Sequence, residues 1–446
     1  MQCIMPPEFI DKILGKLEEC GYDAYLAGGC VRDIVMGREI HDWDIATSAL
    51  PEEVEACFVC GKVLETGAKH GTVTVIAFGG VAEVTTFRVD GKYSDSRRPD
   101  SVKFVRTLSE DLKRRDFTIN AMAMSRSGVI TDLFGGRDDI LKKLIRCVGD
   151  AETRFNEDAL RILRALRFAS KLGFKIEKKT AVAMLCCRGL LSAISAERIY
   201  AELCGALCGE NAGSVFTEFA DIFAVVIPEI KATFGFDQKT KYHCYDIWQH
   251  TVHAVEAAPD DLVLRLTMLF HDLGKPECFT RDANGVGHFY GHGKVSERIA
   301  FDIMTRLKSP AKMRDDVVYL VKYHDERLPE DEKTMRRFLA KHGEERARQI
   351  INVHRADSAA QTEVLRRERA AELKWVEHML DEAVAAGRCV SIKDLAVGGG
   401  DLLKLGIPEG KGIGETLSFL LDHVLENPED NTQKRLIEIA KNTGRV

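Results

Sequence analysis

The sequence predicts an α/β head followed by an all-α remainder, and three observations carry that fold class. Up to about residue 148, short strand-like runs alternate with turn residues and short helical segments, which is the pattern of a mixed sheet domain. After Asp150, apolar residues recur at helical spacing with hardly any strand signal. A chain of 446 residues is also too long for one hydrophobic core, so several domains are expected.

The expected elements of the head follow from where these runs begin and end. An amphipathic helix is expected over residues 8–20, and shorter helices over 32–36 and 52–58. The expected strands cover residues 25–26, 44–46, 72–78, 83–89 and 121–124.

Four domains are expected along the chain, in an elongated multidomain molecule. They are a head (1–150), a helical neck (151–235), a helical body (236–365) and a helical tail (366–446). Pro228 and the Phe234-Gly235-Phe236 stretch indicate the boundary between neck and body. The highly charged helix that follows residues 357–370 indicates the boundary between body and tail.

The composition indicates a globular protein of the cytoplasm. A hydrophobic fraction of 45% and a charged fraction of 30% are ordinary for such proteins. No apolar run reaches the roughly 18–20 residues that a membrane span needs, and the first residues lack the features of a signal peptide. The 13 cysteines form no disulfide-like framework, which favours a reducing compartment.

The net charge of −6 argues against a protein that simply coats nucleic acid. A local basic face would still suffice to bind an RNA. Its candidate residues are Arg161, Arg164, Arg167, Lys171, Lys175, Lys178 and Lys179.

A glycine turn and two carboxylates near the N-terminus are the strongest indication of chemistry. Asp42 and Asp44 are two residues apart on an expected strand, so they project from one face and can hold a pair of divalent cations. Gly28-Gly29 opens a helix, where backbone N–H groups can approach a polyphosphate. A lone D-x-D is usually a solvated strand edge, but the glycine turn favours nucleotidyl transfer. Glu83 is the first candidate for a third carboxylate and Asp116 the second.

Two arginine-containing motifs follow this turn. The segment Asp111–Ala121, with Arg114, Arg115 and Asp116, is expected to hold a buried arginine–aspartate pair beside the active strand, suited to a ribose hydroxyl and a triphosphate. Further on, Glu157-Asp158, Arg161 and Arg164 would share one face of a helix. An acid beside an arginine can read the Watson–Crick edge of a base without a nucleic-acid template. The alternative interpretation is an intrahelical ladder of salt bridges.

A second metal site is predicted in the helical part. His250, the adjacent pair His271-Asp272 and Asp357 stand on successive expected helices and can converge on one metal. Imidazole with carboxylate suits Mn²⁺, Ni²⁺ or Fe as well as Zn²⁺. His292 and His324 could add ligands for a second metal, whereas His253 is interpreted as solvated or structural. The ordered set resembles an HD phosphohydrolase domain, in which a metal activates water to attack a phosphoester.

Taken in order, the head and neck motifs resemble a class II CCA-adding enzyme (tRNA nucleotidyltransferase), with a polymerase-β-like nucleotidyltransferase head and an HD body. The matching segments, which span roughly residues 20–205, are Gly28–Asp33, Asp42–Asp44, Arg114–Asn120, Asp132–Gly136, Glu157–Arg161 and Ser195–Arg198. Residues 392–446 are also similar to the tail of members that contain an HD domain.

This resemblance implies that CTP and then ATP are added to the 3′ end of tRNA, with Mg²⁺, to build C-C-A. It implies metal binding by Asp42 and Asp44. It assigns the triphosphate to Gly28, Gly29 and Arg32, and the ribose and phosphate to Arg115. The implied template for the incoming base consists of Asp158, Arg161, Arg164 and Arg167, with Asp158 and Arg161 pairing with the base itself.

Sister activities in the same family stay open. They are C-C-only addition, A-only addition and poly(A) synthesis. The polar loop over residues 86–99 favours full C-C-A addition, because it can move as a lever and C-C-adding members tend to lack it. From another class, the chain could be a metal-dependent phosphohydrolase whose head only grips a nucleotide. A third alternative is a non-enzymatic tRNA-binding factor, in which Asp42 and Asp44 would be dispensable.

Overall fold

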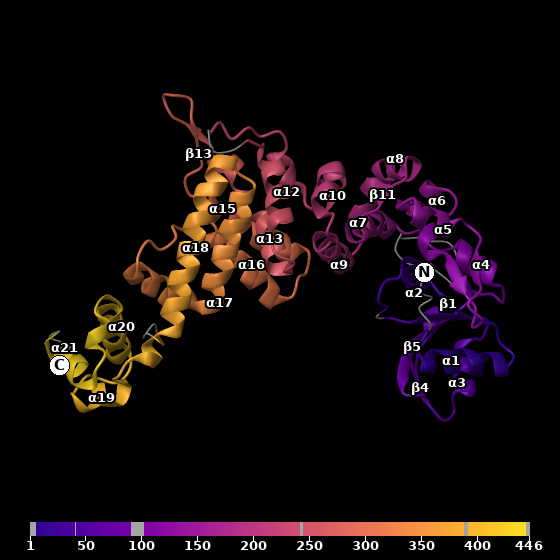
Figure 1. Cartoon of the computed structure of the whole chain (residues 1–446), viewed down its shortest axis with the longest axis horizontal. Helices are drawn as coiled ribbons and strands as arrows, with labels where there is room; N and C mark the ends of the chain where they lie inside the picture. Colours follow the sequence, from indigo (N-terminus) through magenta and orange to yellow (C-terminus); the bar gives the residue numbers. More distant parts are fainter. Residues whose placement is uncertain (1–5, 41, 91–101, 241–243, 388–390, 443–446) are drawn as a thin grey trace. The chain divides into compact units, whose positions relative to one another are not determined.

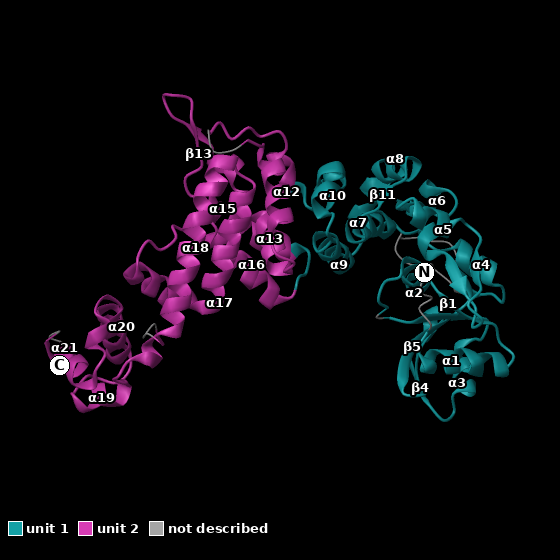
Figure 2. Cartoon of the chain, in the orientation of Figure 1, with its two compact units in different colours: residues 1–228, 306–309 teal, residues 229–305, 310–446 magenta. Residues whose placement is uncertain are grey.

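A computed structural model describes residues 6–40, 42–90, 102–240, 244–387 and 391–442. The chain divides into two compact units (Figure 2). The first contains Met1–Pro228 with Arg306–Ser309, and the second contains Glu229–Thr305 with Pro310–Val446. The α/β part precedes a helical part, which confirms the predicted fold class.

The first unit contains a seven-stranded sheet, of which β1, β4 and β5 are labelled in Figure 1. Its order is β3-β4-β5-β2-β1-β8-β9. The bounds are β1 (Ala24–Ala27), β2 (Asp44–Thr47), β3 (Lys62–Gly67), β4 (Thr72–Ala77), β5 (Gly80–Thr86), β8 (Met122–Met124) and β9 (Ile130–Asp132). Strands β2 and β5 run parallel, and each other neighbouring pair in this sheet is antiparallel.

Helix α1 (Glu8–Glu19) lies against this sheet with one apolar face. Ile10, Ile13, Leu14 and Leu17 recur every three or four residues and are fully buried, as an amphipathic helix requires. Burial of each such side chain contributes about 1.5–3 kcal/mol. The remaining elements of this part are α2 (Gly29–Met36), α3 (Pro51–Cys57), η1 (Ala68–His70), β6 (Arg88–Asp90), β7 (Val102–Phe104), α4 (Leu108–Lys113), η2 (Thr118–Asn120), α5 (Gly136–Leu141) and β10 (Leu144–Ile145).

The strand prediction was wrong at one point and incomplete at others. The strand expected over residues 83–89 is two strands, because Phe87 turns into the core and its N–H donates to the carbonyl of Thr47. Strand β6 then pairs with β7 in a separate ladder. The sequence analysis did not predict β3 or β9. Strand β3 has the sequence KVLETG, which lacks a clear apolar alternation.

The helical end of the first unit places the expected base-reading segment. Its elements are α6 (Ala151–Glu157), α7 (Leu160–Leu172), β11 (Lys175–Ile176), α8 (Lys178–Cys187), η3 (Arg188–Ala193), α9 (Ala196–Leu207), α10 (Ala212–Glu218) and α11 (Ala220–Val226). The single helix expected through residues 157–164 is wrong. Asp158 lies between α6 and α7 with φ −140° and ψ 102°, which is extended backbone.

The second unit is helical, and its long helices run side by side (Figure 1). Helices α12 (Ile247–Ala257), α13 (Leu262–Phe270), α16 (Ala311–Tyr323) and α17 (Glu332–Ala359) pack together. Asp246 and Asp261 cap α12 and α13 by accepting backbone N–H groups. The other elements are η4 (Pro228–Thr233), α14 (Lys275–Cys278), β12 (Thr280–Arg281), β13 (Gly287–His288), α15 (His292–Arg306), α18 (Glu363–Ala385), η5 (Ile392–Asp394), α19 (Gly399–Lys404), α20 (Lys411–Glu426), η6 (Pro428–Asp430) and α21 (Gln433–Asn442).

None of the helices in the described part of the chain is both long enough and apolar enough to cross a membrane. The four-domain division stays a prediction.

Candidate active site and metal centre

Three carboxylates lie close enough to influence one another where β2 runs parallel to β5. The register places Asp44 directly opposite Glu83, and Asp42 precedes Asp44 by two residues. Burial raises the pKa of Asp44 to about 6, with Glu83 and Asp42 adding to the rise and Arg115 opposing it. Crowded carboxylates of this kind favour divalent cations, because a cation removes their mutual repulsion. This acidic cluster is therefore a candidate metal site.

The glycine turn lies against the same cluster. Gly28 has φ 78° and ψ −130° and stands at the N-terminus of α2. A Cβ added to Gly28 would lie 2.7 Å from Nη1 of Arg115 and 3.9 Å from Oδ2 of Asp44. The positive φ favours glycine here, and a Cβ would also push the Arg115 guanidinium aside. The fold thus brings Gly28, Asp44 and Arg115 together, from three separate parts of the sequence.

The buried arginine–aspartate pair expected in this segment is formed by Asp111. Arg115 donates to the buried carboxylate of Asp111 at 3.0 Å, and Arg114 donates to the same carboxylate. Asp116 accepts instead from Nε of Arg164 at 2.8 Å. The guanidinium of Arg164 helps to hold the pKa of Asp116 low although burial acts in the opposite direction. Of the two candidates for the third carboxylate, Asp116 is thus paired with an arginine, whereas Glu83 lies opposite Asp44 in the sheet.

The expected base-reading residues stand at the start of α7. Arg161 is only 7% exposed, and it donates to Glu157 at 2.6 Å and to the carbonyl of Arg114 at 3.0 Å. Asp158 accepts from Arg198 at 2.7 Å. Arg198 belongs to the predicted Ser195–Arg198 motif, but its contact with Asp158 was not foreseen.

The remaining predicted arginines gather near Asp116. Arg32 donates to the side-chain oxygen of Asn120 at 2.8 Å and pairs with Asp33. Arg167 forms an ion pair of 2.8 Å with the buried Glu202 of α9. The sequence analysis missed Glu202, and its local sequence carries no signal beyond lying one turn after Arg198.

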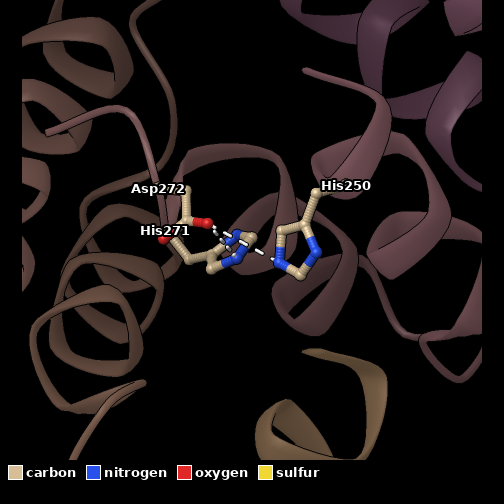
Figure 3. Close-up of side chains that lie close together, drawn as sticks. All are labelled: His250, His271 and Asp272. Carbon is tan, nitrogen blue, oxygen red and sulfur yellow. Dashed lines mark ion pairs between the residues drawn. The ribbon is translucent and has the colours of Figure 1, made fainter. Parts of the chain in front are cut away.

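A second cluster lies deep among the helices of the second unit (Figure 3). His250 of α12, His271 at the end of α13 and Asp272 are almost fully buried. Nε2 of His271 is 3.2 Å from Oδ2 of Asp272, and Nε2 of His250 is 3.6 Å from the same oxygen. Asp357 of α17 joins them, 2.8 Å from Nε2 of His250. The four predicted ligands therefore converge.

The other carboxylate oxygen of Asp272 faces a second pair of histidines. Nε2 of His292 is 3.4 Å from Oδ1 of Asp272, and Nε2 of His324 is 3.7 Å from it. The two histidine Nε2 atoms lie only 2.9 Å apart. Asp272 thus belongs to two candidate metal-binding groups. His253, one turn from His250, pairs with Glu256 and has a side chain that is 44% exposed.

Backbone carbonyls set the tautomer of His250, His271, His292 and His324. Each Nδ1 lies within hydrogen-bond distance of a carbonyl oxygen, which can only accept, so Nδ1 carries the hydrogen. The pairs are His250–Ala360 (3.2 Å), His271–Met268 (2.7 Å), His292–Phe289 (2.9 Å) and His324–Val321 (2.6 Å). In the neutral rings each Nε2 lone pair therefore points into the cluster, as in metal-ligating histidines.

The cluster fits a divalent metal on two further observations. Nε2 of His271 and Oδ2 of Asp272 are both buried and face each other at 3.2 Å, so the imidazole and the carboxylate are already placed together as metal ligands would be. Burial alone would lower the pKa of His271, but Asp272 and Asp357 raise it to about 10, so the site favours a positive charge. The ammonium group of Lys275 provides one positive charge, 2.7 Å from Asp272. Lys275 was not among the predicted ligands. We call these six residues, His250, His271, Asp272, His292, His324 and Asp357, the histidine cluster.

Comparisons with known proteins match both parts of the chain. The "Poly A polymerase head domain" family matches residues 24–146. The "Probable RNA and SrmB- binding site of polymerase A" family matches residues 173–234. A tRNA nucleotidyltransferase domain 2 family matches residues 289–440.

Individual relatives agree with these matches. The CCA-adding enzyme of Lactobacillus delbrueckii subsp. bulgaricus is 54% identical over 207 residues, which cover 46% of this chain and 52% of that protein. The CCA-adding enzyme of Geobacillus stearothermophilus is 54% identical over 201 residues, 45% of this chain and 49% of that protein. The chain thus matches about half the length of these curated relatives.

A solved structure matches over nearly the whole length. The CCA-adding enzyme of Bacillus stearothermophilus in complex with CTP has a TM-score of 0.76 and 32% sequence identity, and the match covers 99% of this chain and 98% of that one. This chain therefore belongs to the family of CCA-adding enzymes.

Proposed function

We propose that this protein adds C-C-A to the 3′ end of tRNA from CTP and ATP. The observation that carries the proposal is the acidic cluster, in which Asp44 lies opposite Glu83, near Asp42 and beside the Gly28 turn. The similar enzyme of Bacillus stearothermophilus was solved in complex with CTP, which supports a nucleotide as substrate. Because tRNA is the substrate and the cysteines form no disulfide-like framework, we place the protein in the cytoplasm.

In this mechanism the protein's residues hold the metal and the triphosphate, ribose and base of the incoming nucleotide. Asp42, Asp44 and Glu83 would hold Mg²⁺, and a metal bound there would help to activate the attacking 3′-hydroxyl and would offset the charge of the leaving pyrophosphate. The N–H groups at the start of α2 and the Arg32 guanidinium bind the triphosphate. Arg115, fixed by Asp111, reaches the ribose and phosphate. Asp158 and Arg161 pair with the base, and their contacts with Arg198 and Glu157 orient them.

The four expected domains take part in this proposal. The head (1–150) carries the acidic cluster and the neck (151–235) the base-reading residues. The body (236–365) carries the histidine cluster, and the tail (366–446) has a hydrophobic core of its own. The loop that favours full C-C-A addition lies largely outside the described residues, at 91–99, so the choice among sister activities rests on the assay below.

The test is extension of tRNA transcripts that end before C-C-A, after C or after C-C. Purified protein with Mg²⁺, CTP and ATP is expected to extend each to a single C-C-A and then stop, as read by sequencing the product ends. Stopping at C-C, starting only from C-C or running on into poly(A) would each select a sister activity. No extension from any transcript would contradict the proposal.

Replacing Glu83 by Gln is expected to lower the rate of addition by about 100-fold, because one of three charges that hold the metal is lost. Raising the Mg²⁺ concentration should recover part of the rate. Glu55, an exposed carboxylate on α3, is the control, and Glu55→Gln should match the unaltered protein in rate and Mg²⁺ dependence. An unaltered Mg²⁺ dependence in Glu83→Gln would exclude Glu83 as a ligand.

We also propose a metal-dependent phosphohydrolase centre at the histidine cluster. Four Nε2 lone pairs and two carboxylates converge there, a donor set that suits Mn²⁺, Ni²⁺, Fe or Zn²⁺. A metal held there would supply an activated water for attack on a phosphoester. Among the chain's own residues, Asp272 is the shared ligand of both groups, and Lys275 neutralises its carboxylate.

A further inference from the structure

One aromatic ring in α7 lies among three arginines. The centroid of Phe168 is 5.4 Å from the guanidinium carbon of Arg32, 5.3 Å from that of Arg164 and 5.0 Å from that of Arg167. The ring is half-buried and packs by its edge on the fully buried Phe117, with centroids 5.9 Å apart. Arg32 comes from α2 and the other two from α7, so the ring joins residues that lie more than 100 positions apart.

Each of the three arginines pairs with a carboxylate, yet the three guanidinium groups remain close together around the ring. Arg32 pairs with Asp33 at 2.9 Å, Arg164 with Asp116 at 2.8 Å and Arg167 with Glu202 at 2.8 Å. Three guanidinium groups around one point still repel one another. The negative face of an aromatic ring attracts cations, so Phe168 offsets that repulsion at their common centre.

The neighbouring helix α9 leaves room for this arrangement. A Cβ added to Gly205 would lie 2.5 Å from Cδ and 3.1 Å from Cγ of Arg167. The aliphatic part of Arg167 therefore lies across Gly205, and a larger residue there would displace it. This contact is independent of the ring and fixes the same arginine.

We propose that Phe168 is a positioning residue that holds Arg32, Arg164 and Arg167 as one binding array for the nucleotide triphosphate. Arg164 and Arg167 then act on phosphate oxygens together with Arg32, and not on the base as the family resemblance implied. Three guanidinium forks suit a triphosphate because each can donate two hydrogen bonds to phosphate oxygens. This inference rests on the proposed nucleotidyl transfer.

The test compares Phe168→Leu, Phe168→Tyr and Phe174→Leu. Phe174 is a buried phenylalanine just after the same helix, so its substitution controls for lost packing. Phe168→Leu is expected to raise KM for CTP and for ATP equally, by about tenfold, with little change in kcat. Phe168→Tyr keeps the ring and should restore both KM values. Phe174→Leu should leave them unchanged.

A binding measurement separates this inference from the proposed function. Calorimetric titration with inorganic tripolyphosphate and Mg²⁺ needs no catalysis, and Phe168→Leu should weaken binding by the same factor as KM rises. If Phe168→Leu does not fold, Gly205→Ala should weaken tripolyphosphate binding by displacing Arg167. Equal affinity in all variants, or a change for CTP but not ATP, would overturn the inference. Unaltered protein that binds tripolyphosphate but extends no tRNA would contradict only the proposed function.

Discussion

Replacing Asp44 by Asn is expected to lower the rate of C and A addition at least about 1,000-fold, the effect of losing several kcal/mol of transition-state stabilisation by a metal. Asn has almost the same shape, so the strand and its pairing with β5 should persist. The rate is measured by single-turnover extension of a tRNA that ends after C-C.

The same variant should fold at least as stably as the unaltered protein in the absence of divalent metal. Burial and the neighbouring carboxylates raise the pKa of Asp44 to about 6, so its ionised form opposes folding at neutral pH. A neutral Asn removes that opposition, and the thermal midpoint should not fall. Asp138→Asn, at an exposed position of α5, is the control and should keep the rate within about twofold. Comparable rates for Asp44→Asn and Asp138→Asn would refute a catalytic role for the acidic cluster.

Replacing His250 by Ala is expected to lower the metal affinity of the histidine cluster by about 100-fold or more, because one ligand is lost from a closed set. Hydrolysis of bis-p-nitrophenyl phosphate should fall with it. His253→Ala is a matched control, since it removes the same side chain from the same helix outside the cluster. Metal content after dialysis, measured by elemental analysis, should fall only in His250→Ala.

Metal binding at the histidine cluster should also raise the thermal stability of the protein. A metal at 100 times its Kd stabilises the folded state by about 2.7 kcal/mol, so Mn²⁺, Ni²⁺ or Zn²⁺ should raise the thermal midpoint of the unaltered protein and of His253→Ala. The midpoint of His250→Ala should respond much less. If all three proteins gain equally, the metal binds elsewhere and the proposed centre is wrong.

Measuring both activities in Asp44→Asn and His250→Ala decides which site carries the main reaction. Loss of tRNA extension only in Asp44→Asn, and of phosphoester hydrolysis only in His250→Ala, would assign one reaction to each cluster. Loss of nucleotide chemistry only in His250→Ala would favour the phosphohydrolase reading, in which the head merely grips a nucleotide.

Short-range patterns were sufficient to predict much of this molecule. Strand-like runs between turn residues located β1, β2 and β4, and apolar residues at helical spacing located α1. Spacing also indicated the pair Asp42 and Asp44, the glycine turn at Gly28, and the convergence of His250, His271, Asp272 and Asp357. These features depend on residues near one another in the sequence, or on an ordered set of residue types suited to one metal.

Only the tertiary structure decided which charged groups face each other. The register of β2 against β5 placed Glu83 opposite Asp44, while packing of α7 turned Asp116 toward Arg164. The break at Asp158, the contact of Glu202 with Arg167 and the ring of Phe168 among three arginines had no local signal. The physical reason is that a charge pairs with whatever group the fold brings within a few ångströms, and strand register and helix packing set that distance independently of separation along the chain.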